Sequence, residues 1–263
     1  MSHTYDNDYT GKIRIYNYSI RKATGVTPST AGCKNRITDI EFVKPQVIED
    51  GRFLFGDMYD DTLNVGLRTI KGSMYFSETY ESASILQMFY NCKALTSLKD
   101  FTLNASSDKP IYMTVAFMNS SVDDKMIQEF KIVGFKKESI LSYSQAFPCT
   151  NITHINNKFV GKNATNFYSA FEGTPVTYLP AGILDKCLRG TRAFAASQLS
   201  SMSPNVSLGN LIRGSEMFSA CPMSYTLSKQ LYNTLPQASG AAMPSNRNDD
   251  LDYYITFACV LGE

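Results

Sequence analysis

Residues able to do acid–base chemistry are few and scattered in this chain. Its only histidines are His3 and His154. His154 lies between Ile152 and Ile155 in a strand-like stretch, so we expect its side chain to face solvent and take no part in catalysis. A Ser-His-Asp or Cys-His catalytic arrangement therefore lacks a suitable histidine. We expect no catalytic residue and a protein that is not an enzyme.

Three adjacent aspartate pairs are the other candidates for catalysis: Asp60-Asp61, Asp123-Asp124 and Asp249-Asp250. Glycoside cleavage uses two carboxylates that meet in space, whatever their spacing in sequence. We interpret these pairs as solvated loop charges. A solenoid polysaccharide depolymerase stays an alternative function, which carboxylate-dependent loss of polymer length would support.

No strong metal or cofactor signature occurs. Asp6 and Asp8, followed by Gly11, resemble the opening of a calcium loop, but Asn17 stands where such a loop needs a bidentate Glu. Whether Asp6 and Asp8 bind a cation stays open. No phosphate-binding loop of the G-x-x-x-x-G-K-[ST] type is present. The cysteines form no CxxC pair, which argues against zinc and predicts free buried thiols: Cys33, Cys92, Cys149, Cys187, Cys221 and Cys259. We expect no cofactor.

Composition bounds the class of protein. The 263 residues can bury a substantial core, and 43% hydrophobic against 19% charged residues argues against disorder. A formal net charge of +1 gives no electrostatic footprint for nucleic acid. No apolar run of about 18 residues occurs, so we expect no membrane insertion. The start of the chain carries no basic and apolar signal pattern, which predicts synthesis in the cytoplasm without export by that route.

A repeated pair, Met or Ala followed by Phe, organises the middle of the chain. Its Phe positions are 28, 30, 24, 23 and 24 residues apart, a period typical of stacked supersecondary units. The pairs are Met88-Phe89, Ala116-Phe117, Ala146-Phe147, Ala170-Phe171, Ala193-Phe194 and Met217-Phe218. The pattern predicts a ladder of stacked, buried phenylalanine side chains.

Matching positions follow each pair. Four residues before Phe the residue is apolar or small, which predicts one helical turn around the pair. A small or turn-forming residue comes at about +3, and apolar residues come at +5, +8 and +12, which predicts a short strand in a parallel stack. Gln230 breaks the +12 position in the last unit. The longer spacing after Phe117 predicts an inserted helix over about residues 123–130.

The segments MFYNCKALTSL and AFEGTPVTYLPAGIL resemble the BspA-like, Treponema-type leucine-rich repeat over about residues 83–232. The resemblance implies an α/β repeat fold: a right-handed solenoid of short parallel strands with short helical or irregular segments opposite. It also implies use in adhesion and surface recognition. The units here are unequal in length and no export signal is visible, which departs from that family.

The ends differ from the repeats. We expect residues 1–64 to form a β-rich cap or attachment module, with strands near Ile13–Ile20 and from Ile37. The segment from Phe55 to Tyr59 is the candidate for a degenerate first repeat, because Tyr59 lies 30 residues before Phe89. Residues 65–234 are the predicted repeat region. Residues 235–263 predict an extended loop and a C-terminal strand that caps the stack, or alternatively exchanges with another subunit.

A solenoid acts through the side chains that it exposes, so we look for function among them. Five tyrosines are candidates for exposed recognition residues, although half-buried packing is the simpler interpretation: Tyr112, Tyr143, Tyr168, Tyr178 and Tyr225. We expect a recognition or assembly module on a phage tail fibre or other virion structural appendage. Its partner would be a host-surface glycan or protein receptor, or another structural protein, and a homo-oligomer is possible. The alternative is a bacterial BspA-like adhesin or scaffold in the cytoplasm or at the cell surface.

Overall fold

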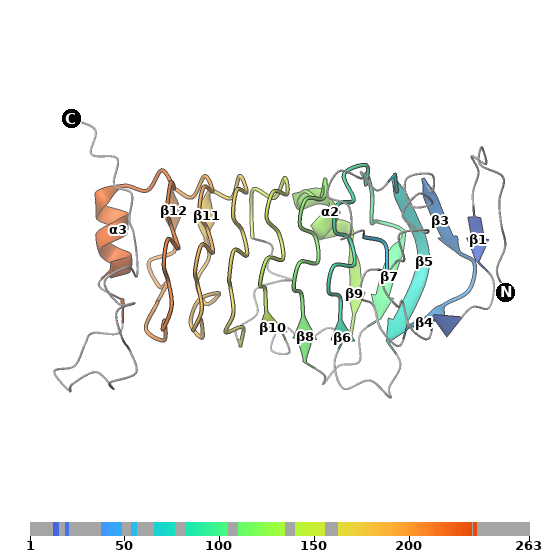
Figure 1. Cartoon of the computed structure of the whole chain (residues 1–263), viewed down its shortest axis with the longest axis horizontal. Helices are drawn as coiled ribbons and strands as arrows, with labels where there is room; N and C mark the ends of the chain where they lie inside the picture. Colours follow the sequence, from blue (N-terminus) through green and yellow to red (C-terminus); the bar gives the residue numbers. More distant parts are fainter. Residues whose placement is uncertain are drawn as a thin grey trace.

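The structure is a computed structural model that describes residues 13–15, 19–20, 38–48, 54–56, 66–76, 83–104, 110–134, 140–155, 163–232 and 234–235. The described chain forms an elongated body in which successive turns lie side by side along the long axis (Figure 1). The early strands lie at one end and the last helix lies at the other.

Every strand pairing described is parallel. One sheet contains β1 (Ile13–Ile15), β2 (Ser19–Ile20), β3 (Asp39–Phe42), β4 (Gln46–Ile48), β5 (Thr69–Phe76), β7 (Phe101–Asn104) and β9 (Lys131–Val133). A second sheet contains β6 (Ala83–Ser84), β8 (Ile111–Tyr112) and β10 (Ile140–Ser142), and a third pairs β11 (Tyr178–Leu179) with β12 (Ser201–Met202). Parallel strands dominate and helices are few, so the described chain is a mixed structure, loosely of the α/β class.

The strands predicted near the N-terminus are confirmed as β1, β2 and β3. They share a sheet with β7 and β9, because β5 pairs with β3 and β4 on one side and with β7 on the other. Gly72 lies in the middle of β5 with φ of +100°, and a Cβ there would come within 2.3 Å of the Phe42 carbonyl oxygen. Only glycine therefore fits where β5 crosses Phe42.

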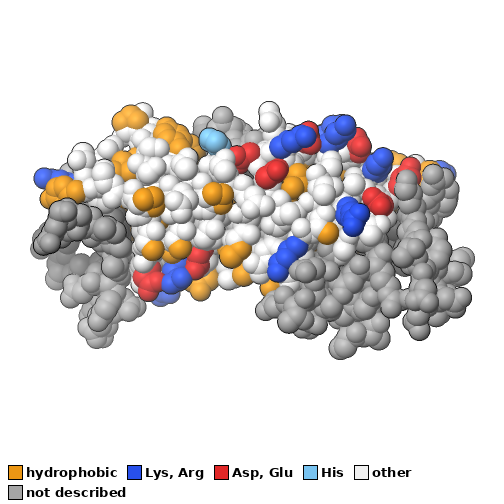
Figure 2. All heavy atoms as spheres, turned by 90° about the horizontal axis from the view of Figure 1, so that it is seen from above, with side chains coloured by type: hydrophobic (Ala, Val, Ile, Leu, Met, Phe, Trp, Pro, Cys, Tyr) orange, Lys and Arg blue, Asp and Glu red, His pale blue; other side chains and the backbone are white. Residues whose placement is uncertain are grey.

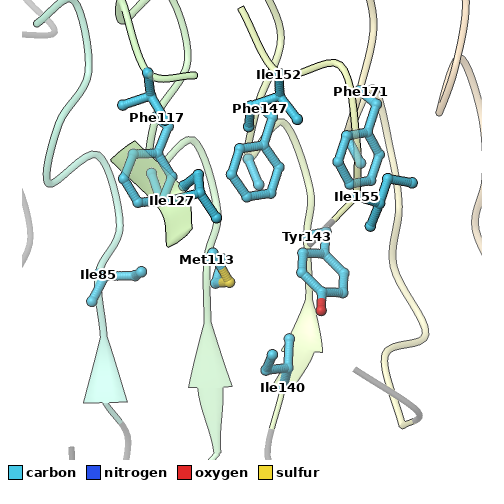
Figure 3. Close-up of a cluster of buried hydrophobic side chains, with 14 of the residues drawn as sticks. Ile85, Met113, Phe117, Ile127, Ile140, Tyr143, Phe147, Ile152, Ile155 and Phe171 are labelled. Carbon is cyan, nitrogen blue, oxygen red and sulfur yellow. The ribbon is translucent and has the colours of Figure 1, made fainter. Parts of the chain in front are cut away.

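A column of stacked phenylalanine rings runs through the core. Neighbouring ring centroids are 5.2–5.6 Å apart with interplanar angles of 3–26°. The column, here called the phenylalanine ladder, consists of Phe55, Phe89, Phe117, Phe147, Phe171, Phe194 and Phe218; Figure 3 shows three neighbouring members. The predicted ladder is thus confirmed for all six pairs. The first rung described is Phe55, which belongs to the predicted degenerate repeat; Tyr59 lies outside the described residues.

Backbone hydrogen bonds repeat along the ladder. Each ladder Phe from Phe55 to Phe194 donates its N–H to the carbonyl of the residue just before the next ladder Phe, at 2.7–2.9 Å. Neighbouring units, each the stretch from one ladder Phe to the next, are therefore joined by main-chain bonds as well as by ring contact. Aromatic pairs in this geometry contribute about 0.5–1.5 kcal/mol each beyond burial.

The helical turn predicted around each pair is wrong. The chain instead makes two β-turns, one on each side of the ladder Phe. Around Phe89, Met88 donates its N–H to the Ile85 carbonyl at 3.1 Å and Cys92 donates its N–H to the Phe89 carbonyl at 3.2 Å. In each unit the residues two before and two after Phe have positive φ, between 47° and 65°. These residues are Gln87 and Asn91, Val115 and Asn119, Gln145 and Cys149, Ser169 and Gly173, Arg192 and Ala196, and Glu216 and Ala220. A helix cannot contain such left-handed residues.

The small residue at +3 bonds to a ladder carbonyl. Ser120, Thr150 and Thr174 donate their hydroxyl groups to the carbonyl oxygen of the Phe in their own unit at 2.6–2.8 Å. Cys92 and Cys221 donate instead to the ladder carbonyl of the preceding unit, at 3.6 and 2.9 Å. The position is buried, so a short donor satisfies a polar group that no water reaches.

The apolar marks after the turn face the core as predicted. The predicted apolar residues at +5, +8 and +12 are buried or nearly so, with Leu95 and Leu98 one place later in their unit: Leu95, Leu98, Phe101, Val122, Ile152, Ile155, Val176, Leu179, Ile183, Leu199, Met202 and Val206. The predicted strands are present but very short. They reduce to β11, β12 and single parallel bridges such as His154 with Tyr178. Phe159, at +12 in its unit, lies outside the described residues.

Two helices are described. The predicted insertion after Phe117 is confirmed as α2 (Asp124–Glu129), whose N-cap Asp123 accepts a hydrogen bond from Met126 N–H at 2.8 Å. The helix α3 (Tyr225–Tyr232) closes the described repeats and was not expected from the sequence. It buries Leu231 in place of Gln230, which restores an apolar side chain one residue late. The predicted C-terminal strand lies outside the described residues.

Candidate recognition surface

The tyrosines singled out from the sequence are mostly displayed. The exposed fractions are 40% for Tyr112, 42% for both Tyr168 and Tyr178, and 66% for Tyr225. Tyr143 is fully buried and is no longer a candidate for display: it lies four residues before Phe147, a position that faces the core, and its ring lies 5.1 Å from that of Phe167. Half-buried packing, the simpler interpretation, therefore does not describe most of these tyrosines. Four candidates therefore remain available to a partner.

The short segments that enter each pair of turns carry a group of exposed side chains. We call this the entry face and define it by Tyr112, Tyr168, Leu188, Arg189, Ile212 and Arg213. Its backbone is held in one parallel row, because Ser142 bridges Asn166, Asn166 bridges Arg189, and Arg189 bridges Arg213. The spacing of these side chains is therefore fixed by the register of neighbouring units.

The segments that follow the turns form a second row of backbone bridges, and their exposed side chains are mainly hydroxyl and aromatic groups. Thr177, Tyr178, Ser200 and Ser201 are exposed there, and His154 bridges Tyr178 from the preceding unit. His154 is exposed as predicted and appears as the pale blue side chain in Figure 2. In that view most of the described surface is white, so uncharged polar groups and backbone dominate it.

Asp124 is anchored and is not the solvated loop charge expected from the sequence. Its Oδ1 accepts the backbone N–H groups of Thr153 and His154, each at 3.0 Å. Its Oδ2 accepts the Thr153 hydroxyl and lies 3.0 Å from His154 Nδ1. Burial raises the pKa of Asp124, but these hydrogen bonds outweigh it, so the pKa lies below its ordinary value.

This arrangement orients an imidazole against a carboxylate, as hydrolytic triads do. The Nδ1 atom is the one engaged, with Asp124 and with the Thr153 hydroxyl at 2.7 Å. Within the described ranges, no hydroxyl or thiol is hydrogen-bonded to the Nε2 of His154. The contacts of Asp124 with Thr153 and His154 instead join the first turn of α2 to the next unit.

A second cross-unit link runs through Arg192. Its guanidinium contacts Glu172 Oε1 at 2.5 Å from Nη2 and 3.1 Å from Nε, and it contacts Glu216 on the other side. Burial raises the pKa of Glu172, but hydrogen bonds from Arg192 and Ser169 and the Arg192 charge outweigh it and lower the pKa. This triplet was not expected from the sequence, although Arg192 and Glu216 both lie two residues before a ladder Phe.

The described cysteines are free, as predicted, but the prediction of a buried thiol is wrong for Cys149. Cys92, Cys187 and Cys221 are buried and Cys149 is exposed. Burial raises the pKa of Cys187 to about 12, with only a partial offset from the backbone N–H of Arg189, and burial likewise raises the pKa of Cys221. Such thiols stay protonated near neutral pH and are poor nucleophiles or metal ligands.

The remaining sequence candidates lie outside the described residues: His3, Asp6, Asp8, Cys33, Asp60, Asp61, Asp249, Asp250 and Cys259. Among the residues that are described, no three His, Cys, Asp or Glu side chains converge as a metal site requires. In the same part of the chain, neither helix has the length or apolar composition to span a membrane.

No family model, no curated protein and no solved structure matches the chain.

Proposed function

We propose that residues 65–234 form a right-handed solenoid of the leucine-rich-repeat type. Three repeated features support this fold: the stacked rings of the phenylalanine ladder, the identical hydrogen bond from each ladder Phe to the next unit, and the pair of left-handed residues around each ladder Phe. Units that contact only their neighbours are characteristic of repeat proteins.

Such a scaffold would serve as a non-enzymatic recognition or assembly module. The observation that carries this proposal is the display of Tyr112, Tyr168 and Tyr178 at fixed positions on a ladder whose rings and backbone leave little freedom between units. Rigid, amphipathic tyrosine side chains give contact area at low conformational cost. The partner would be a surface glycan or protein, or another structural protein.

The narrower part of the proposal places the module on a phage fibre or other virion appendage. The described turns form an elongated stack (Figure 1), a shape that suits a fibre, which must hold a displayed surface away from its point of attachment. Mass spectrometry of purified particles from the source of this gene would detect the chain; its absence from intact particles would refute this placement.

Recognition itself is tested on cells. Fluorescently labelled chain should bind the host cell, and a variant with Tyr112, Tyr168 and Tyr178 all changed to Ser should bind at least about tenfold more weakly. A matched control changes Thr96, Lys99 and Asp100 to Ser, because these exposed residues lie just after Phe89, apart from the three displayed tyrosines in sequence. Equal loss in both variants, or no binding by the unaltered chain, would contradict the proposal.

A further inference from the structure

Two arginines of the entry face lie side by side in equivalent positions. Arg189 and Arg213 are Cα partners in a parallel bridge, and each lies five residues before its ladder Phe, Phe194 and Phe218. Adjacent strands are about 4.8 Å apart, so two like charges start from neighbouring backbone positions. Like charges directly opposite each other are unfavourable unless an anion lies between them.

The same local backbone presents both arginines. The N–H groups of Leu188 and Arg189 both donate to the Thr165 carbonyl, at 2.9 and 3.0 Å. The N–H groups of Ile212 and Arg213 both donate to the Leu188 carbonyl, also at 2.9 and 3.0 Å. Two residues opposing one is the geometry of a β-bulge, which breaks the in–out alternation. Each unit therefore exposes an aliphatic side chain and an arginine together.

Neither guanidinium is neutralised within the described part of the chain. Arg189 and Arg213 are exposed and have no ion pair or side-chain hydrogen bond there. Arg192, three residues after Arg189, lies between Glu172 and Glu216 instead. Neighbouring units thus alternate charge at one position and repeat positive charge at another, so the second position leaves two guanidinium groups open to an external anion.

We propose that the entry face binds an acidic polysaccharide through Arg189 and Arg213. The planar guanidinium matches a carboxylate or sulfate with two hydrogen bonds. Leu188, Ile212 and Tyr168 would contact the less polar faces of the sugar rings, with exposed fractions of 36%, 50% and 42%. This inference rests on the proposed recognition function and names the chemistry of its ligand.

The surroundings favour a glycan over other polyanions. Glu172 and Glu216 lie on the same units, and the whole chain carries a formal charge of only +1. Nucleic acid needs a wider positive surface, because its phosphates are dense along the strand. An acidic peptide could not add as a strand beside Arg189, because neighbouring units flank that position on both sides.

Binding is measured with the full chain by isothermal titration calorimetry against polygalacturonate and dextran sulfate, with neutral dextran and single-stranded RNA as comparison ligands. We expect binding to at least one acidic polysaccharide and none to neutral dextran. The variant R189Q/R213Q should bind about tenfold or more weakly. The matched control R68Q/K99Q removes the same charge from exposed positions in earlier units and should leave affinity unchanged.

Several results would overturn the inference: no binding to either acidic polymer, equal weakening in the control variant, or tighter binding to RNA than to both glycans. Urea unfolding of each variant checks that the fold is retained. Cell binding separates the two proposals. If R189Q/R213Q still binds cells while the triple tyrosine variant does not, recognition stands and the acidic-glycan inference fails; if the unaltered chain binds acidic glycan but not cells, the proposed function fails alone.

Discussion

Truncation of one ladder rung tests the packing of the core directly. Phe171 is 1% exposed, and its ring lies 5.2 Å from that of Phe147 and 5.4 Å from that of Phe194. Phe171→Ala should lower the free energy of unfolding by about 3–5 kcal/mol, as other buried aromatic truncations do. Part of this loss comes from two ring pairs worth about 0.5–1.5 kcal/mol each.

Two further variants divide that loss into its causes. Phe171→Leu keeps most of the apolar volume but removes both ring contacts, so we expect a loss of about 1–3 kcal/mol. Tyr168→Ala truncates an aromatic side chain three residues away that is 42% exposed, and it should cost under about 1 kcal/mol.

Urea unfolding followed by far-ultraviolet circular dichroism measures all three. Because units contact mainly their neighbours, a damaged middle rung should also lower the slope of the transition as the two halves uncouple. A loss below about 1 kcal/mol for Phe171→Ala, or a loss equal to that of Tyr168→Ala, would refute the ladder as the source of stability.

Three other predictions concern backbone strain, close packing and pH. Val115 has a β-branched side chain at φ of 56°, so Val115→Asn should raise the free energy of unfolding by about 1 kcal/mol in urea; a loss would contradict strain there. Gly56→Ala should lower the free energy of unfolding by about 1–3 kcal/mol, because its Cβ would meet backbone atoms at 2.3 and 2.6 Å. Gly190→Ala should lower it less, because the new methyl group meets the flexible Met217 side chain. A lower melting temperature for Gly190→Ala than for Gly56→Ala would contradict this packing. Because the pKa of Asp124 is lowered on folding, its stabilisation is present above the ordinary value of 3.8 and is lost as pH falls below it, so Asp124→Asn should flatten the stability profile between about pH 5 and 3; an unchanged profile would count against the link to His154.

The sequence was sufficient to predict the ladder because each rung is the same residue type, Phe, at a nearly regular spacing along the chain. The degenerate first repeat was placed correctly in the segment from Phe55 to Tyr59, but spacing favoured Tyr59 as its rung because the 34-residue distance from Phe55 to Phe89 departs from the regular period. The helix α2 was predictable for a similar reason: an over-long unit must place its extra residues somewhere, and Asp123 supplies an N-cap.

The turns and the entry face were harder to predict. Left-handed φ at Val115, Arg192 or Glu216 leaves no trace in residue type, because these residues do not favour it; tertiary packing imposes it. Residue type alone does not separate the buried Tyr143 from the displayed tyrosines; its position four residues before Phe147 does. The pairing of Arg189 with Arg213 could have been found from their equal distances to the following ladder Phe.

The direction of the main-chain bonds has a mechanical consequence. The bond from each ladder Phe to the next unit runs between neighbouring turns, which follow one another along the long axis (Figure 1). Tension applied to the two ends of the stack therefore loads these contacts in series, and the weakest interface opens first. Each opened unit of some two dozen residues would release about 80 Å of chain. Stretching would then dissipate a sudden pull in steps while the unopened units keep their shape.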